Sequence, residues 1–428
     1  MSELVERKPS NNYVIYVVIM LSIVNLFNFM DRMLMAVLLP DIQADLNLTD
    51  TQLGILTGFA FALFYAIFGV PLARLADIWS RTGVISISIA FWSAATALCG
   101  AAGGFLTMLL ARMGVGIGEA GGTPPSHSLI SDYVSEDRRA TALAIHTVGA
   151  TLGMSAGLAL GGVLSDTIGW RWTFVCFGVP GIILALIVAF TIREIPRGYS
   201  DNREPDTAGA PALSETLKYF VARKSYVYVV IAMSVGAFLV NGINQWLPTF
   251  YFRNHGLTQT EIGIFFGIAL GFGYALGAIS GGILADRLNK RDIRFALYLG
   301  IAALVVSVPA WIAVLVVEDV RLALGFNFLA AFLSNIVAGP LLAIIQSVAP
   351  PRMRAMSTAI YILLAAIVGV GAGPFIVGYV SDILKPMFDD QSLRYALLFT
   401  LSFTIIPVLA LWRAGRFVEH DIATAKAY

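Results

Sequence analysis

Six charged or amide side chains interrupt stretches of sequence that are otherwise apolar. They are Asn25, Asn28, Asp31 and Arg32 in NLFNFMDRML, and Arg112 and Glu119 in ARMGVGIGEAG. A charge at the middle of a bilayer costs several kcal/mol on insertion scales, so ionisable residues within a membrane-spanning helix indicate function. The chemistry open to such residues is to bind and release a proton, or to hold an ion of opposite charge.

Helix geometry divides the four polar residues of NLFNFMDRML into two sets. Adjacent residues of an α-helix point about 100° apart, so Asp31 and Arg32 cannot share a face. Arg32 follows Asn25 by seven positions and Asn28 by four, and the three side chains form one polar stripe. We expect this stripe to contact a substrate, and we expect Asp31 to lie at its edge and face a different neighbour.

The second pair suits reversible protonation. Arg112 and Glu119 are two helical turns apart on one face, roughly 10 Å along the axis. This separation lets a flexible arginine move between Glu119 and another acid, such as Asp31. A buried carboxylate whose arginine partner comes and goes can bind and release a proton in the physiological range. Glu119 and Asp31 are therefore the candidate proton-coupling residues, and Arg112 joins Arg32 as a candidate for binding an anion.

A static role for the same charges stays open, because a buried ionic network can serve only to fix the register of the helices. His127 and His146 lie in the same part of the chain and fit satisfied polar residues better than ligands. The apolar segments of the second half contain asparagine and glutamine but few groups that titrate. Any proton site therefore belongs to the first half.

The elements that carry these residues are predicted to be membrane-spanning helices. The chain is 58% hydrophobic and 13% charged, whereas soluble proteins are nearer half apolar and a quarter charged. A helix needs about 20 apolar residues to cross a bilayer. The sequence predicts an all-α polytopic membrane protein with twelve spans, near 13–38, 52–74, 83–101, 105–130, 139–164, 171–192, 225–250, 260–284, 294–316, 321–347, 353–384 and 394–413.

A polar segment with proline and glycine separates the spans into two sets of six. We predict an N-terminal half at 1–192, a linker at 193–224 with a short amphipathic helix at its end, and a C-terminal half with a short tail at 225–428. Lysine and arginine gather in alternate loops, which places both termini and the linker in the cytoplasm. The polar start of the chain and the long first apolar run argue against a cleaved signal sequence.

A short pattern that ends in aspartate recurs four times. GGILADR, GGVLSD and GYVSD each place glycine four residues before aspartate, and ARLAD has alanine at that position; the aspartates are Asp77, Asp166, Asp286 and Asp382. Matching copies lie about half the chain apart, and the two copies within each half fall on opposite sides of the membrane. This arrangement predicts duplicated halves that are each built from inverted three-helix repeats.

The twelve spans, the long middle loop and these end motifs resemble the major facilitator superfamily. Its loop signature, G-x-x-x-D-R-x-G-R, is matched after the eighth span by Gly282, Asp286, Arg287 and Lys290/Arg291. The first copy keeps only Asp77 and Arg81. The resemblance implies a cytoplasmic gate formed by Asp77, Arg81, Asp286 and Arg287. It also implies alternating access, in which the two halves rock around a central site.

Three motifs give a narrower resemblance. NFMDR, RMGVGIGEAG and EDRRATALAI are similar to the spinster-like branch of the superfamily, most closely over residues 20–190. Animal members are similar to exporters of sphingosine-1-phosphate or lysophospholipids, and this chain resembles a bacterial member in the inner membrane. The resemblance implies proton coupling at Glu119 and an anionic head group held by the arginines. We expect a secondary transporter of a lipid-like anion, driven by a proton gradient and without a cofactor.

Other functions are compatible with the same motifs. A proton-coupled symporter of small organic anions, such as sugar acids, would use the same arginines, and a binding or sensor protein would keep the fold without transport. An intramembrane enzyme is disfavoured because the sequence contains no H-E-x-x-H, nucleophile elbow or phosphate-binding glycine loop. The net charge of +1 and the lack of a basic block disfavour nucleic acid. We expect a small-molecule substrate and the lipid bilayer as partners, with no metal and no obligate protein partner.

Overall fold

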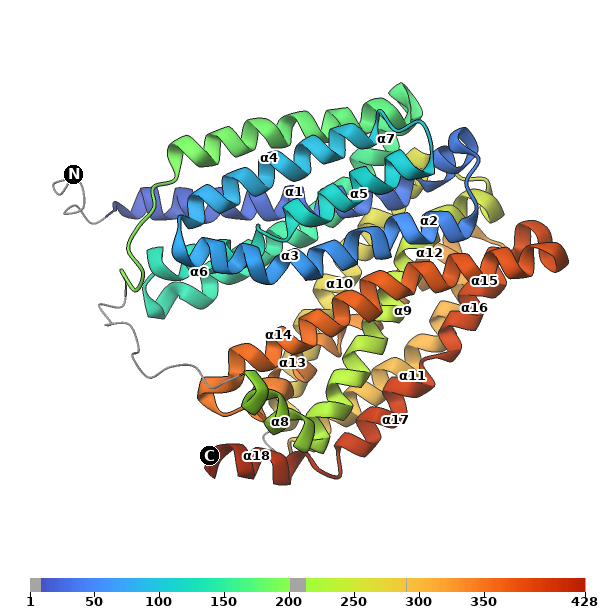
Figure 1. Cartoon of the computed structure of the whole chain (residues 1–428). Helices are drawn as coiled ribbons and strands as arrows, with labels where there is room; N and C mark the ends of the chain where they lie inside the picture. Colours follow the sequence, from blue (N-terminus) through green and yellow to red (C-terminus); the bar gives the residue numbers. More distant parts are fainter. Residues whose placement is uncertain (1–8, 201–212, 290, 428) are drawn as a thin grey trace.

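The protein is a bundle of long helices. The computed structural model describes residues 9–200, 213–289 and 291–427, so Lys290 of the loop signature lies outside the described residues. Within those ranges the chain forms α-helices and short 3-10 and π segments, and no β-strand. Figure 1 shows two groups of helices, one from each half of the chain, which diverge toward the end of the bundle where the chain termini lie. We call this the terminal end and the opposite one the far end.

The first group consists of α1 (Asn11–Leu46), α2 (Asp50–Thr57), α3 (Phe59–Ile78), α4 (Arg81–Cys99), α5 (Phe105–Glu119), α6 (Thr123–Tyr133) and α7 (Glu136–Thr191). The predicted linker helix is present as α8 (Leu213–Ala222).

The second group begins with α9 (Lys224–His255), α10 (Gln259–Asn289), α11 (Arg294–Val316), α12 (Val320–Asn335) and α13 (Ala338–Ser347). It continues through η1 (Pro351–Met353), α14 (Arg354–Leu364), the π-helix η2 (Ala365–Ala372), α15 (Gly373–Phe388) and η3 (Asp389–Gln391). It ends with α16 (Ser392–Ser402), α17 (Ile405–Ala414) and α18 (Val418–Ala427).

These helices supply the twelve predicted crossings. Nine segments of the described chain are long and apolar enough to span a membrane. Two of them, Glu136–Thr191 and Met356–Ala414, are 56 and 59 residues long and each cross twice. The remaining crossing is made by α5 and α6 together. The predicted fold class, with six crossings in each half, is therefore confirmed.

Two of the interruptions in the helices of the first half lie at or beside glycine. Gly169, with φ of 80°, turns α7 back on itself between its two crossings. The fourth crossing breaks at 120–122, between α5 and α6, and Pro124 and Pro125 follow directly after the break. Those prolines lie in the first turn of α6, where proline is tolerated because the N–H it lacks would have no partner within the helix.

The two groups touch along closely packed backbones toward the far end. α7 packs against α10, and α2 against α15. Glycine makes both approaches possible: a Cβ atom added to Gly162 would lie 2.1 Å from the carbonyl oxygen of Gln259, and one added to Gly378 would lie 2.2 Å from that of Asp50. Gly69 and Gly282, toward the terminal end, have nothing within 4 Å of such an atom.

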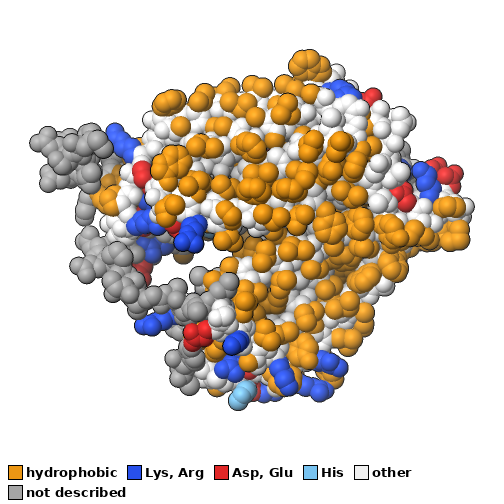
Figure 2. Space-filling view, viewed as in Figure 1, with side chains coloured by type: hydrophobic (Ala, Val, Ile, Leu, Met, Phe, Trp, Pro, Cys, Tyr) orange, Lys and Arg blue, Asp and Glu red, His pale blue; other side chains and the backbone are white. Residues whose placement is uncertain are grey.

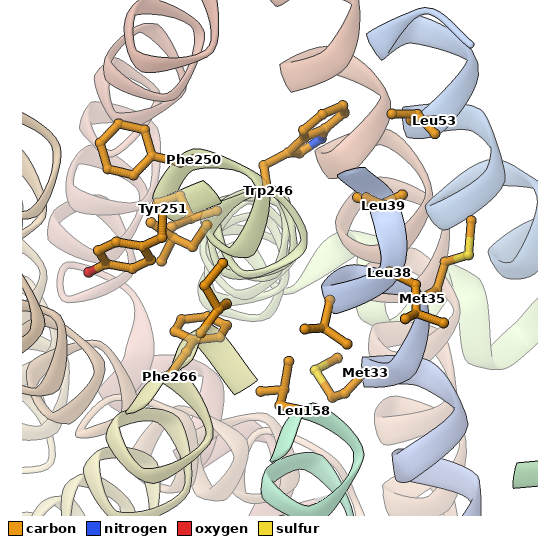
Figure 3. Close-up of a cluster of buried hydrophobic side chains, with 14 of the residues drawn as sticks. Met33, Met35, Leu38, Leu39, Leu53, Leu158, Trp246, Phe250, Tyr251 and Phe266 are labelled. Carbon is orange, nitrogen blue, oxygen red and sulfur yellow. The ribbon is translucent and has the colours of Figure 1, made fainter. Parts of the chain in front are cut away.

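An apolar cluster from both halves reinforces this closure. Figure 3 shows side chains of α1, α2 and α7 facing those of α9 and α10; the labelled residues are Met33, Met35, Leu38, Leu39, Leu53, Leu158, Trp246, Phe250, Tyr251 and Phe266. All are less than a tenth exposed. Burying apolar area contributes about 25 cal/mol per Å² to stability. This cluster therefore stabilises the contact between the two halves.

The outer surface fits a lipid environment. Large apolar side chains such as Ile67, Val70, Leu106 and Phe190 are exposed. Figure 2 shows that apolar side chains cover the middle of one face while charged ones gather toward its two ends. It also shows a hollow between the two groups at the terminal end.

Candidate functional site

The centre of the site is an ion pair between α1 and α5. The Nε atom of Arg32 donates to Oε2 of Glu119 at 2.6 Å. The Glu119 side chain is fully buried, whereas that of Arg32 is 20% exposed. Glu119 is the last residue of α5, immediately before the break in the fourth crossing. The arginine therefore links a buried carboxylate to a more open space.

Aromatic rings surround the guanidinium of Arg32. Its Cζ atom lies 4.9 Å from the ring centroids of Phe29 and Phe61 and 5.0 Å from that of Tyr65. A cation over an aromatic face gains about 0.5–2 kcal/mol, more when water is excluded. These rings, from α1 and α3, stabilise the charge of Arg32 beside its bond to Glu119.

Asp31 faces a different helix, as its helical position predicts. Thr96 of α4 donates a hydrogen bond to Oδ2 of Asp31 at 2.9 Å. The other carboxylate oxygen has no hydrogen-bond partner among the described residues, and Asp31 is only 3% exposed. A buried oxygen without a partner costs free energy, so Asp31 is held on one side only.

Arg112 lies near both acids without pairing with either. It is 3% exposed, and its Nε atom donates to the backbone oxygen of Leu56 at 3.4 Å. Asp31 and Glu119 both lie within its electrostatic reach. No ion pair of 4.0 Å or less joins Arg112 to an acid in the described part of the chain. The predicted exchange of Arg112 between two carboxylates stays a prediction, because Glu119 pairs with Arg32 in this structure.

The two asparagines of the predicted stripe lie deeper than Arg32. Asn25 donates to the backbone oxygen of His146 at 2.9 Å, which ties α1 to α7. Asn28 is 2% exposed, and neither of its amide atoms has a partner among the described residues. In this structure only Arg32 of the stripe is partly exposed.

The terminal end of the first half is held by contacts within that half and with the segment that follows α7. Arg81 pairs with Asp132 and Glu194, and its Nε atom lies 2.7 Å from Oε1 of Glu194. Arg197 pairs with Asp77 at 3.1 Å. Asp286 and Arg287 are exposed at the end of α10. Among the residues that the structure places, neither Asp77 nor Asp286 has a partner in the opposite half.

Glu194 has an environment that favours its charged form. Burial would raise the pKa of its carboxyl group, but the N–H of Thr82 and the side chains of Arg81 and Ser80 donate hydrogen bonds to it. Together they hold the pKa of Glu194 below the ordinary value of 4.5. The first turn of α4 is therefore tied to the segment after α7 by an ionised side chain.

At the far end, aspartates of one half bind helix N-termini of the other. Asp382 of α15 accepts hydrogen bonds from the backbone N–H groups of Asp50 and Thr51, at 3.1 and 2.7 Å. Asp166 of α7 accepts one from the N–H of Thr260 in α10, at 2.8 Å. Negative charge is stabilised at a helix N-terminus. Both contacts therefore hold the two halves together.

An ion pair supplements these helix caps. Arg253 of α9 pairs with Asp50 at 2.6 Å and also donates to Gln43 of α1 at 2.6 Å. Asp50 is 2% exposed in its side chain. The far end is thus closed by a polar network from both halves.

The comparisons with known proteins decide the family. Residues 21–374 match the Major Facilitator Superfamily. The chain belongs to this superfamily. Its fold and family are those of membrane transporters, so the expected resemblance is confirmed.

Relatives of this transporter include spinster proteins. It is 31% identical to an MFS-type efflux pump of Mycolicibacterium smegmatis, over 94% of this chain and 92% of the relative. It is 24% identical to protein spinster homolog 1 of Xenopus laevis, over 97% of this chain and 83% of that protein. The spinster-like character predicted from the helix motifs is therefore confirmed.

Solved structures share this fold. A bacterial homologue of the human lysosomal transporter spinster, in an inward-facing and unoccupied conformation, is 29% identical with a TM-score of 0.89, covering 96% of this chain and 99% of that one. Its inward-facing and occupied form has a TM-score of 0.85. The nucleoside transporter NupG shares the fold at 12% identity and a TM-score of 0.74.

Sequence reasoning had not assigned roles to Asp166 and Asp382 in the transporter. Both end copies of the repeated motif, in which glycine precedes aspartate by four residues. The signal was therefore present, because the glycine allows the helices to touch and the aspartate then reaches the facing N-terminus. What the pattern does not state is which helix it faces.

Proposed function

We propose that this protein is a proton-coupled transporter of an amphiphilic, lipid-like anion in the bacterial inner membrane, working by alternating access. The observation that carries the proposal is the Arg32–Glu119 pair, in which a partly exposed guanidinium is held by a fully buried carboxylate. Both termini lie in the cytoplasm in this proposal, so the open terminal end faces the cytoplasm.

Competition for one arginine would couple the proton to the substrate. Glu119 and an anionic head group both need the guanidinium of Arg32, and a proton on Glu119 weakens its hold on that group. Oε1 of Glu119 has no partner among the described residues and is free to take the proton. Asp31 and Arg112 lie beside this exchange and adjust its balance of charge.

A cavity in the second half suits the apolar part of such a substrate. It has a volume of about 230 Å³ and lies between α9, α11, α12, α13, α14, α16 and α17. Met233, Leu304 and Leu341 line it together with Asn241 and Asn335. An apolar cavity with a few polar groups is the usual form of a site for a small amphiphile.

The far-end network is the external gate in this proposal, and Asp77, Arg81, Asp286 and Arg287 belong to the cytoplasmic gate. In an outward-open state the far-end contacts break, and Asp77 and Asp286 gain partners in the opposite half. The pseudo-symmetry of the four motif copies supports this exchange of contacts between the two ends.

Reconstituted protein tests the coupling. Proteoliposomes with an imposed pH gradient should accumulate labelled lysophospholipid or sphingosine-1-phosphate, and Glu119→Gln should exchange the substrate without concentrating it. Glu318→Gln changes an exposed carboxylate and is the control. Accumulation that Glu119→Gln leaves intact contradicts the coupling role. Uptake of sugar acids with no response to lipids would assign the protein to small organic anions.

A further inference from the structure

A small polar cavity lies behind the ion pair, within the first half. It is enclosed by Val24, Asn25, Asn28, Trp92, Gly122, Thr123, Ser126 and His146. Its volume is about 10 Å³, which is close to the least space that holds one water molecule. The residues come from α1, α4, α6, α7 and the break between α5 and α6, so the cavity sits where four crossings meet.

The walls of this cavity carry polar atoms that no protein group satisfies. Asn28 presents an unpaired Nδ2 and Oδ1, and Trp92 presents an unpaired Nε1. The two residues are 2% and 0% exposed. Each unsatisfied buried group costs about 1–3 kcal/mol, and a water molecule that makes three hydrogen bonds would remove that cost.

The cavity lies between two titratable sites. On one side, Asn28 lines the cavity and separates it from the Glu119 carboxyl group, whose Oε1 has no partner in the described chain. On the other side, His146 is 1% exposed and its Nδ1 atom lies 3.4 Å from the amide nitrogen of Asn25. The His146 ring is 4.9 Å from that of His127, and His127 is exposed.

Arg32 cannot serve as the outlet for this proton. A guanidinium stays protonated in proteins and has no acceptor atom, so a proton on Glu119 needs a route that avoids it. Imidazole is suited to the task because one ring nitrogen accepts a proton while the other releases one. The charged groups around Glu119 are Arg32, Arg112 and Asp31. The titratable group that faces His146 is His127.

We propose that an ordered water in this cavity, His146 and His127 form a path by which the proton of Glu119 leaves toward the terminal end. The proposal rests on the proposed function, in which Glu119 binds the transported proton. Glu119 gives its proton to the water, which passes another to a ring nitrogen of His146. The imidazolium then loses a proton from its second nitrogen to His127, and His127 releases one to solution. Each group ends with the proton count it began with, except Glu119.

The rate at which Glu119 loses its proton tests the path without any substrate. The full-length protein in lipid nanodiscs is subjected to an upward pH jump, and the carboxyl C=O band is followed by time-resolved infrared spectroscopy. The band missing from Glu119→Gln identifies the group. His146→Gln should slow the decay of this band by about tenfold or more, within the range of general acid–base effects. His420→Gln, at an exposed position of α18, is the matched control.

A second variant distinguishes the loss of the proton path from misfolding of the protein. His127→Ala should slow the same decay, and millimolar imidazole should restore it, because His127 is exposed and a free imidazole can replace its ring. An unchanged rate in both histidine variants overturns the path, and so does slowing in His127→Ala that imidazole leaves uncorrected. A Glu119 band that never responds to pH removes the proposed function itself.

Discussion

At the scale of single residues, Arg32 is set apart by its surroundings. Its guanidinium donates to Glu119 and lies among three aromatic rings while remaining 20% exposed. Arginine is suited to this position because its planar group stacks on rings and offers several donors in a fixed arrangement. A lysine ammonium would keep the charge but would be a compact, strongly hydrated point.

Arg32→Lys therefore tests geometry against charge. We expect it to weaken binding of an anionic lysophospholipid by about tenfold, which corresponds to about 1.4 kcal/mol, because the stacked and directional contacts are lost. Binding to purified protein is measured by calorimetry at constant pH. Arg321→Lys changes an exposed arginine in the first turn of α12 and should leave the affinity unchanged. Equal affinities for Arg32→Lys and the parent would show that charge alone suffices.

The sequence predicted the helix faces of the charged residues better than the partners that those residues have. The 100° step of a helix correctly separated Asp31 from Arg32, which face Thr96 and Glu119. The spacing on one helix also drew attention to Arg112 as the partner of Glu119, whereas in this structure the partner is Arg32. Spacing along a helix fixes a face but not the neighbour that the face meets, and that depends on packing between helices.

At the scale of elements, the repeated motif works by close approach of helices. Gly162 and Gly282 occupy matching positions in two copies, but only Gly162 lies against another helix in this structure. The same substitution at the two sites should therefore have different effects. This contrast gives a control within the motif itself.

Gly162→Ala should disfavour the state described here. Its Cβ atom would lie 2.1 Å from the carbonyl oxygen of Gln259, and overpacking of this kind costs about 1–3 kcal/mol. Pulsed electron paramagnetic resonance between spin labels at Ile78 and Leu284 reports the distance between the two halves at the terminal end. Gly162→Ala should shift the population toward shorter distances, while Gly282→Ala should leave the separated population in place. Identical distance distributions for the two variants would contradict this.

The network around Glu194 gives a pH-dependent prediction. Its pKa is held below 4.5, so its contribution to stability is complete above about pH 4.5 and disappears as the pH falls through the lower folded value. Thermal unfolding of the parent and Glu194→Gln, followed from pH 7 downward, should show a constant gap that closes only in acid. Glu318→Gln should show no such gap. A gap that persists at the lowest pH would exclude the ionised carboxylate as its cause.

The sequence located the crossings but not all of their ends. The first was predicted at 13–38, whereas α1 is Asn11–Leu46, because hydropathy marks the part in lipid and the helix continues past it. The short helix predicted at the end of the linker is present as α8. The break at 120–122 arises where Gly121 and Gly122 pack against Ser88 and Trp92, which is a tertiary contact that local propensity does not contain.

At the scale of the whole molecule, the far end is closed while the terminal end is hollowed. The far end holds helix caps, an ion pair and an apolar cluster that cross between the halves, and the terminal end is hollowed (Figure 2). Rigid-body rocking predicts that these far-end contacts must break in every transport cycle. A link across them should therefore stop transport while leaving the terminal end open to ligand.

Cysteines at Thr51 and Asp382 test this requirement, in a background where Cys99 and Cys176 are replaced by alanine. The two native side chains are 2.6 Å apart and belong to opposite halves. A short, reducible bis-thiol linker between them should abolish lysophospholipid transport in proteoliposomes, and reduction should restore it. The matched control joins Asp41 and Ser165, which are also 2.6 Å apart but lie in one half. Because the first half moves as a unit in the rocking mechanism, that link should leave transport intact. Transport that continues with Thr51 and Asp382 joined would require a substrate route that never opens the far end, and alternating access would then be excluded for this protein.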